Sequence, residues 1–343
     1  MMKKILTLSM LFVATALFAQ EDATEKKLSI SGSVDAYYRA NLTAPSDENA
    51  IAPGSSFANL PGFALGMANV VMSYEGEKAG FVADLVFGPR GADAVFASPQ
   101  AGAFYASSNI VNQLYAYWNV SESVTLTMGN FNTFLGYEVI SPTANFNYST
   151  SYLFSYGPFS HTGLKADIAL GEDTSLMLGV FNDTDLTEFN STGDYAFGAQ
   201  LGFSGQYLNV LVDPSFFEVD FTGGFDISDD FFLGINGAYL SVEDDAGGFY
   251  GAALYPQLAT SDAFTIGLRA EYFVEDKNFG AIGTGVDDSS VFAATITGSY
   301  TVDNLTIKPE LRLDSASDDA FIDNDLAASK SLGSFVLAAI YSF

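Results

Sequence analysis

The stretch LSISGSVDAYYRANL, residues 28–42, alternates between apolar and polar side chains at successive positions. Successive side chains of a β-strand point to opposite faces of the sheet, whereas a helix repeats about every 3.6 residues. The alternation therefore predicts a strand with one apolar face, and the opposite face carries Asp35 and Arg39.

The same alternation recurs along the chain and predicts about sixteen strands, in the even-numbered range of single-chain bacterial barrels. Hydrophobic residues make up 48% of the sequence and charged residues 16%, but no apolar run beyond the N-terminus is long enough for a transmembrane helix. A high apolar content in which apolar and polar residues alternate is typical of a membrane β-barrel, in which every backbone group is paired. We therefore predict an all-β fold, a transmembrane antiparallel barrel. The expected strands are 28–42, 63–75, 81–88, 111–120, 124–131, 161–170, 174–182, 194–204, 207–213, 216–227, 230–241, 248–258, 263–274, 289–301, 305–314 and 332–343.

The connections between these strands alternate between short and long. Outer-membrane barrels have short periplasmic turns and longer extracellular loops, so we assign the two sets to these two sides. A soluble β-sandwich or propeller also alternates, but it need not separate its connections by length. The short connections contain EGEKAG, SES, GED, SGQ, SDD, TSD and VDN, and the long ones are 44–62, 89–110, 132–160, 183–193, 242–247, 275–288 and 315–331, with a brief exception near Pro214.

The two ends of the chain fit an exported protein. Residues 1–19 have two lysines followed by a short apolar stretch, the layout of a secretory signal peptide, with a retained N-terminal anchor as the alternative. Residues 20–27 would then be a short periplasmic segment and 28–343 the barrel. The chain ends on SFVLAAIYSF, where Tyr341 and Phe343 are expected to face lipid. This aromatic end resembles the signal read by the barrel-assembly machinery of Gram-negative bacteria.

The polar strand faces predict a charged lumen. A barrel of about sixteen strands is wide enough for an aqueous channel. The formal net charge is −28, and acidic residues outnumber basic ones on the polar faces, so the channel should prefer cations. The expected pore-lining residues are Asp35, Arg39, Asp84, Lys165, Asp167, Glu218, Asp220, Arg269, Glu271, Lys308, Glu310, Arg312 and Asp314.

The longest connection, residues 132–160, is rich in aromatic residues and has Glu138 as its one formal charge. Large apolar patches are rarely exposed without a purpose, so these aromatic side chains need a packing surface. We expect the loop to fold into the barrel as a constriction with Glu138, Asn145 and Asn147 at the pore edge. The alternative is packing over the mouth or against another protomer.

The residues needed for catalysis or for tight metal binding are scarce. His161 is the single histidine, so a catalytic site of the serine–histidine type would have to pair it with Ser160 or Ser155. Ser160 is its immediate neighbour and would point to the opposite strand face, and nothing in the sequence fixes the position of Ser155. A structural role for His161 is therefore favoured over catalysis. With no cysteine, a typical zinc site cannot form. The acidic loop clusters do not match a calcium-loop spacing, which leaves loose cation contacts at most. The negative charge disfavours nucleic acid, and no cofactor is expected.

A family resemblance lies between Gln113 and Asp183. GYEVI, NFNYSTSYLFSYGPF and HTG, within residues 129–163, are similar to the OmpL-like β-barrel porins, and QLYAYWNV and LMLGVFND resemble the neighbouring strands of that family. The resemblance implies an outer-membrane barrel that acts as a porin, without catalytic residues.

Two functional hypotheses follow. The first is a porin for passive diffusion of small hydrophilic solutes, which the polar inward faces favour. The second is a non-conducting barrel, plugged by its own loops, that serves as a surface anchor or assembly component. Outer-membrane lipid and the barrel-assembly machinery are expected partners in both cases, and self-association is left open.

Overall fold

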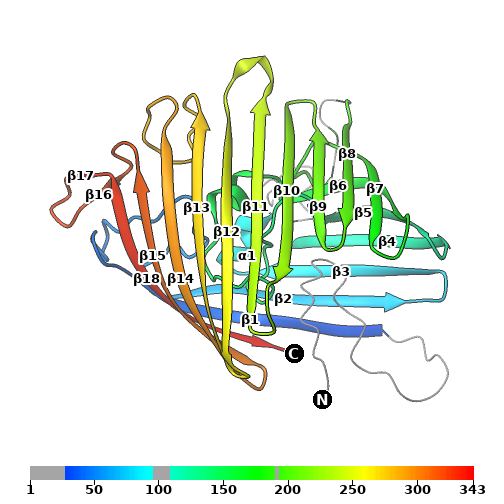
Figure 1. Cartoon of the computed structure of the whole chain (residues 1–343), viewed down its shortest axis with the longest axis horizontal. Coiled ribbons are helices and arrows are strands. Elements are labelled where there is room, and N and C mark those ends of the chain that lie inside the picture. The colour runs from blue at the N-terminus through cyan, green and yellow to red at the C-terminus, as the bar shows by residue number, and fades with distance from the viewer. Residues whose placement is uncertain (1–27, 96–108, 189, 191–192) are drawn as a thin grey trace.

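The computed structural model describes residues 28–95, 109–188, 190 and 193–343 and contains a closed antiparallel β-barrel (Figure 1). Within these residues sixteen strands form the ring, which confirms the predicted fold, while the expected leader 1–19 and segment 20–27 lie outside them. The strands of the ring are β1 (Leu28–Asn41), β2 (Gly62–Glu75), β3 (Ala79–Phe87), β4 (Val111–Ser121), β5 (Val124–Asn132), β6 (Ser160–Ala169), β7 (Thr174–Phe181), β8 (Ala196–Phe203), β9 (Gln206–Val212), β10 (Phe216–Asp226), β11 (Phe231–Val242), β12 (Gly248–Ser261), β13 (Phe264–Asp276), β14 (Ser290–Val302), β15 (Leu305–Ala316) and β18 (Ser331–Ser342).

The connections are separated by length between the two ends of the barrel, with the short connection 213–215, which contains Pro214, as the exception. The short turns are 76–78, 122–123, 170–173, 204–205, 227–230, 262–263 and 303–304. The described residues of the other end are 42–61, 88–95, 109–110, 133–159, 182–188, 190, 193–195, 213–215, 243–247, 277–289 and 317–330. These loops contain α1 (Pro89–Ala94), α2 (Tyr152–Tyr156), η1 (Glu243–Asp245) and the small hairpin of β16 (Phe321–Ile322) and β17 (Ala328–Ser329). In the described ranges, none of the helices has the length and apolar character needed to cross a bilayer.

The alternation in sequence becomes an alternation in burial, most clearly along β15. Leu311 and Leu313 point outward and are 48% and 47% exposed, whereas Glu310 and Arg312 point inward and are 1% and 4% exposed. Aromatic side chains also stand on the outer face, among them Trp118. The outside of the barrel is therefore an apolar band suited to lipid, and its polar groups lie inside.

The last strand closes the ring against the first. β18 pairs with β1, and the pairing continues past the end of β18, where Phe343 and Gly32 exchange two backbone hydrogen bonds of 3.0 Å. Tyr341 and Phe343 are 47% and 54% exposed on the outer face. The final aromatic residue thus takes part in barrel closure, because it extends the ladder that removes the free sheet edge.

The orientation predicted from loop length can be tested on intact cells. A protease-cleavable tag inserted at 243–247 or 317–330 should be cut by added protease, because both connections lie at the long-loop end. The same tag at 303–304 should be protected until the outer membrane is opened. Cleavage at 303–304 in intact cells would reverse the assignment.

Candidate functional site

Residues 133–159, here called the lumen loop, connect β5 to β6 and lie inside the barrel, where they bond to inward-facing side chains of several strands. The interior wall gives the apolar side chains of the loop the packing surface that water would deny them. Its buried side chains include Leu135, Tyr137, Ile140, Tyr148, Tyr152, Leu153, Phe154 and Phe159.

The two ends of the lumen loop are tied together where it leaves the wall. Thr133 Oγ1 lies 2.9 Å from Nε2 of His161, which is fully buried. The backbone N–H groups of Phe159 and Ser160 donate to Asp185 Oδ1 at 2.6 and 2.9 Å. Burial raises the pKa of Asp185 to about 6, although both N–H groups favour its charged form. His161 thus has a structural contact at the base of the loop.

A buried ion pair fixes the first half of the lumen loop. Glu138 Oε1 accepts a hydrogen bond of 2.7 Å from Nη1 of Arg269 on β13, and both side chains are almost completely buried. The other oxygen of Glu138 accepts from the backbone N–H of Ser151 at 2.7 Å. Arg269 also donates to the carbonyl of Ser149 and to Thr295 Oγ1. Because each charge has several partners, its desolvation cost is offset.

Two wall carboxylates bind the second half of the lumen loop through its backbone. Glu310 on β15 accepts from the N–H groups of Tyr148 and Ser149 at 2.8 and 3.2 Å. Glu271 on β13 accepts from the N–H groups of residues 152 and 153 at 3.0 and 2.8 Å, at the start of α2. Hydrogen bonds to an ionised acceptor are about twice as strong as neutral ones, so these contacts hold the loop firmly.

Basic wall residues bind the carbonyl groups of the same loop. Lys308 Nζ donates to the carbonyl of Asn145, and Arg312 Nη1 donates to the carbonyl of Thr150 at 2.8 Å. Arg312 also pairs with Asp314 at 2.7 Å. The alternating charged side chains of β15 therefore form hydrogen bonds with peptide groups of the loop. Lys308 and Arg312 donate to carbonyl groups, and Glu310 accepts from backbone N–H groups.

A third side of the lumen holds the loop through α1 and β1. Arg90 Nε and Nη1 donate to the carbonyls of Ile140 and Tyr148, each at 2.9 Å. The Tyr148 hydroxyl donates to Asp35 Oδ2 at 2.5 Å. The lumen loop is thus anchored to separate parts of the ring, so it crosses the interior.

Arg90 was missed by the sequence analysis, because strand parity says nothing about residues in loops. One signal was available, since Arg90 is the single basic residue between Lys78 and Lys165. A lone cation in a long apolar loop needs a partner, and here two loop carbonyls provide it.

Three of the predicted pore-lining acids have no basic partner among the described residues. Asp84 on β3 accepts from Asn112 Nδ2 at 2.6 Å, and Asp220 on β10 accepts from Asn209 Nδ2 at 2.5 Å. Glu218 is buried on β10, and its Oε2 has no hydrogen-bond partner within the described ranges. Amide side chains are therefore the hydrogen-bond donors to Asp84 and Asp220 in place of a base.

The remaining predicted pore-lining residues differ in exposure. Arg39 is 1% exposed, and none of its guanidinium nitrogens has a hydrogen-bond partner among the described residues. Lys165 and Asp167 on β6 form an ion pair of 3.1 Å, with side chains 21% and 29% exposed. This pair is the most open part of the predicted charged lining.

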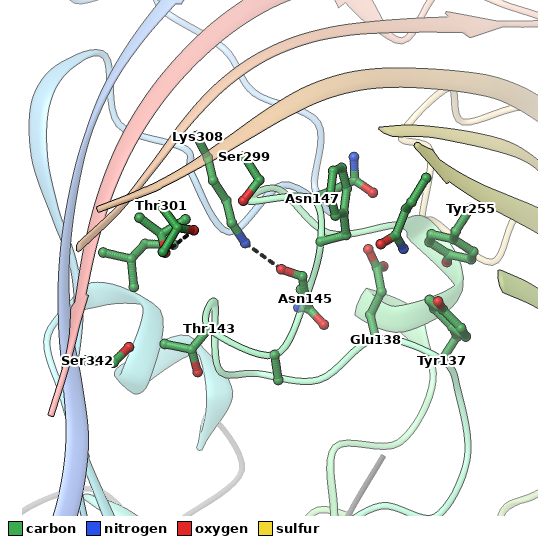
Figure 2. Close-up of a pocket in the computed structure, with 15 residues that line it drawn as sticks. Tyr137, Glu138, Thr143, Asn145, Asn147, Tyr255, Ser299, Thr301, Lys308 and Ser342 are labelled. Atoms are coloured by element: carbon green, nitrogen blue, oxygen red, sulfur yellow. Dashed lines mark hydrogen bonds between the residues drawn. The ribbon is translucent and has the colours of Figure 1, made fainter. Parts of the chain in front are cut away.

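A cavity of about 270 Å³ lies between the lumen loop and strands β12, β14, β15 and β18 (Figure 2). Glu138, Asn145 and Asn147, the three residues expected at the pore edge, border it from the loop side. Ser299 and Lys308 border it from the wall side. The structure thus gathers the three loop residues around one space inside the barrel.

Comparison with known proteins gives both a family match and a fold match. The family model described as "Putative beta-barrel porin-2, OmpL-like" matches residues 27–343. No curated protein matches the sequence. The outer-membrane channel DcaP of Acinetobacter baumannii is similar in structure with a TM-score of 0.63 and 14% identity, over 92% of this chain and 97% of that chain.

Two other solved structures share the architecture. OmpF of Salmonella typhi, in complex with daunomycin, aligns with a TM-score of 0.63 and 11% identity over 93% of this chain and 98% of that one. The anion-selective porin from Comamonas acidovorans aligns with a TM-score of 0.58 and 10% identity over 93% and 100%. Identities this low establish the fold.

Hydrogen exchange can test the anchoring of the lumen loop. In Glu271→Gln a neutral acceptor replaces the carboxylate, so amide exchange at residues 152 and 153 should accelerate by about tenfold. Asp167→Asn is the matched control, because Asp167 pairs with Lys165 on the same strand. Equal exchange in the wild type and Glu271→Gln would show that Glu271 does not hold the loop.

Proposed function

The chain belongs to the OmpL-like family of β-barrel porins, and we propose from this premise that it forms a water-filled channel for passive diffusion of small hydrophilic solutes across the outer membrane. In this proposal the lumen loop is the constriction. The observation that carries it is a loop fixed across the interior from several sides, with an open cavity beside it.

The excess of acidic over basic residues on the inward strand faces supports a preference for cations. Arg269, Lys308 and Arg312 are engaged by the lumen loop or by neighbouring carboxylates. Asp84 and Asp220 have amide partners and no basic partner among the described residues. Carboxylates in a narrow wet passage raise the local cation concentration.

A second candidate function is a non-conducting barrel that serves as a surface anchor or assembly component. It is favoured by one observation, the large number of buried charge-assisted bonds between the loop and the wall. Planar-bilayer recording separates the two candidates. Discrete ohmic conductance steps are expected for the porin, and silent insertion of folded protein would favour the anchor.

Shortening the lumen loop tests its role as a constriction. Deletion of residues 140–150 should raise single-channel conductance about twofold or more, because it widens the open cross-section, and should admit larger sugars in liposome swelling. The matched control is an equally long deletion of 318–328, which removes β16 and the first residue of β17 from the hairpin outside the ring (Figure 1). Unchanged conductance in a correctly assembled 140–150 variant would place the loop outside the permeation path.

Ion selectivity tests the electrostatic part of the proposal. Reversal potentials in a KCl gradient should show cation preference near about 0.1 M, where the Debye length is about 10 Å, and the preference should fade near about 1 M. Asp167→Asn should weaken it, since Asp167 is the more exposed member of its ion pair. Anion preference at low salt would contradict the proposal.

A further inference from the structure

The cavity beside the lumen loop extends to residues at the short-turn end of the barrel. Thr301 lies near the end of β14, Thr306 near the start of β15 and Ser342 at the end of β18, so all three flank that end. Figure 2 shows the loop residues Thr143 and Asn145 and the wall residues Ser299 and Lys308 around this space, with Lys308 joined to Asn145 by a hydrogen bond. A solute that enters from the turn end would meet the cavity before it meets the loop.

The cavity is polar, but its two charged side chains already have partners within the protein. Glu138 is bound by Arg269 and by the N–H of Ser151. Lys308 is bound by the carbonyls of Pro142 and Asn145. An ionic solute would have to break these contacts or remain unpaired, and both are costly away from bulk water.

Several neutral polar groups of the cavity retain hydrogen-bonding capacity. The side chains of Gln257, Ser299 and Ser342 make no hydrogen bond among the described residues, and the side-chain oxygen of Asn147 is also unpaired there. Hydroxyl and amide groups supply both donors and acceptors. They suit a solute that is itself both a donor and an acceptor at many positions.

Aromatic residues border the same cavity on one side. Tyr137 stacks on Tyr255 with ring centroids 4.2 Å apart, and Phe146 lies along the loop nearby. Such rings offer a flat apolar surface next to the polar groups. Pyranose sugars combine hydroxyl groups around the rim with apolar C–H faces, which matches this combination.

We propose that the cavity is a binding subsite for a neutral polyhydroxylated solute of mono- or disaccharide size. The inference rests on the proposed channel function, because it names the solute class that would use the channel. A volume of about 270 Å³ lies just below the range of about 300–1,000 Å³ for small-molecule sites, which suits one sugar ring, so a disaccharide would bind by one of its rings. Gln257, Ser299 and Asn147 would bind the hydroxyl groups.

The test measures sugar binding without requiring conductance. Purified protein in an amine-oxide detergent, which carries no sugar, is titrated with glucose and maltose by saturation-transfer NMR. Both should bind saturably and compete with each other, and galacturonate, similar in size to glucose but charged, should bind about fivefold more weakly or worse. Equal or tighter galacturonate binding, or the absence of saturable sugar binding, would overturn the proposal.

Variants locate the site. Gln257→Ala combined with Ser299→Ala should weaken glucose binding about tenfold, as expected for two lost hydrogen bonds. Ser175→Ala, on β7 and outside the cavity lining, should leave it unchanged. Equal affinity in the double variant and the wild type would place the binding elsewhere and reject this cavity. Heat-modifiable gel mobility confirms that each variant is a folded barrel.

Bilayer recording keeps this inference separate from the proposed function. Saturable sugar binding by a barrel that never conducts would retain the subsite and reject the porin. Conductance without saturable sugar binding would retain the porin and reject the subsite. If the protein both conducts and binds sugar, glucose added at the turn side should reduce the ion current at concentrations that match its binding. The double variant should need an about tenfold higher glucose concentration for the same reduction.

Discussion

The rest of the structure depends on the closure of the backbone ladder between β1 and β18. In lipid each unpaired N–H or C=O group costs several kcal/mol, and an open sheet edge would leave a row of such groups. The strands must therefore form a closed ring. A ring of sixteen strands is too wide for its own inward side chains to fill. Closure in lipid therefore creates an interior that water, a loop or both must occupy, and here a loop occupies much of it.

The lumen loop is compatible with that interior because its peptide groups complement the charges of the wall. Glu310 and Glu271 accept from loop amides, while Lys308 and Arg312 donate to loop carbonyls. A segment without regular secondary structure has unpaired peptide groups, and burial would make them costly without such partners. The charges of the wall and the irregular backbone of the loop thus satisfy each other.

The sequence predicted the wall better than the contents of the lumen. The alternation of apolar and polar residues predicts both that a segment is a strand and which side chains face inward. The inward position of Lys308 or Glu310 therefore follows from a pattern of period two. Their partners do not follow from it. Glu138 pairs with Arg269 across 131 positions of sequence, and Arg90 enters from a loop that has no periodicity. The aromatic content of 132–160 indicated that this loop needs a packing surface, whereas the particular wall groups that bind it depend on three-dimensional closure.

Loop anchoring and ion selectivity are coupled in the proposed channel. The loop engages most of the basic groups on β13 and β15, either through its carbonyls or through Glu138. Asp84 on β3 and Asp220 on β10 accept hydrogen bonds from amide side chains and do not pair with a base among the described residues. Glu138 is the one formal charge of the loop, and its pairing with Arg269 removes one positive charge from the balance of the inward-facing residues. The electrostatic character of the lumen therefore arises from the fold of the loop as much as from the net charge of the chain.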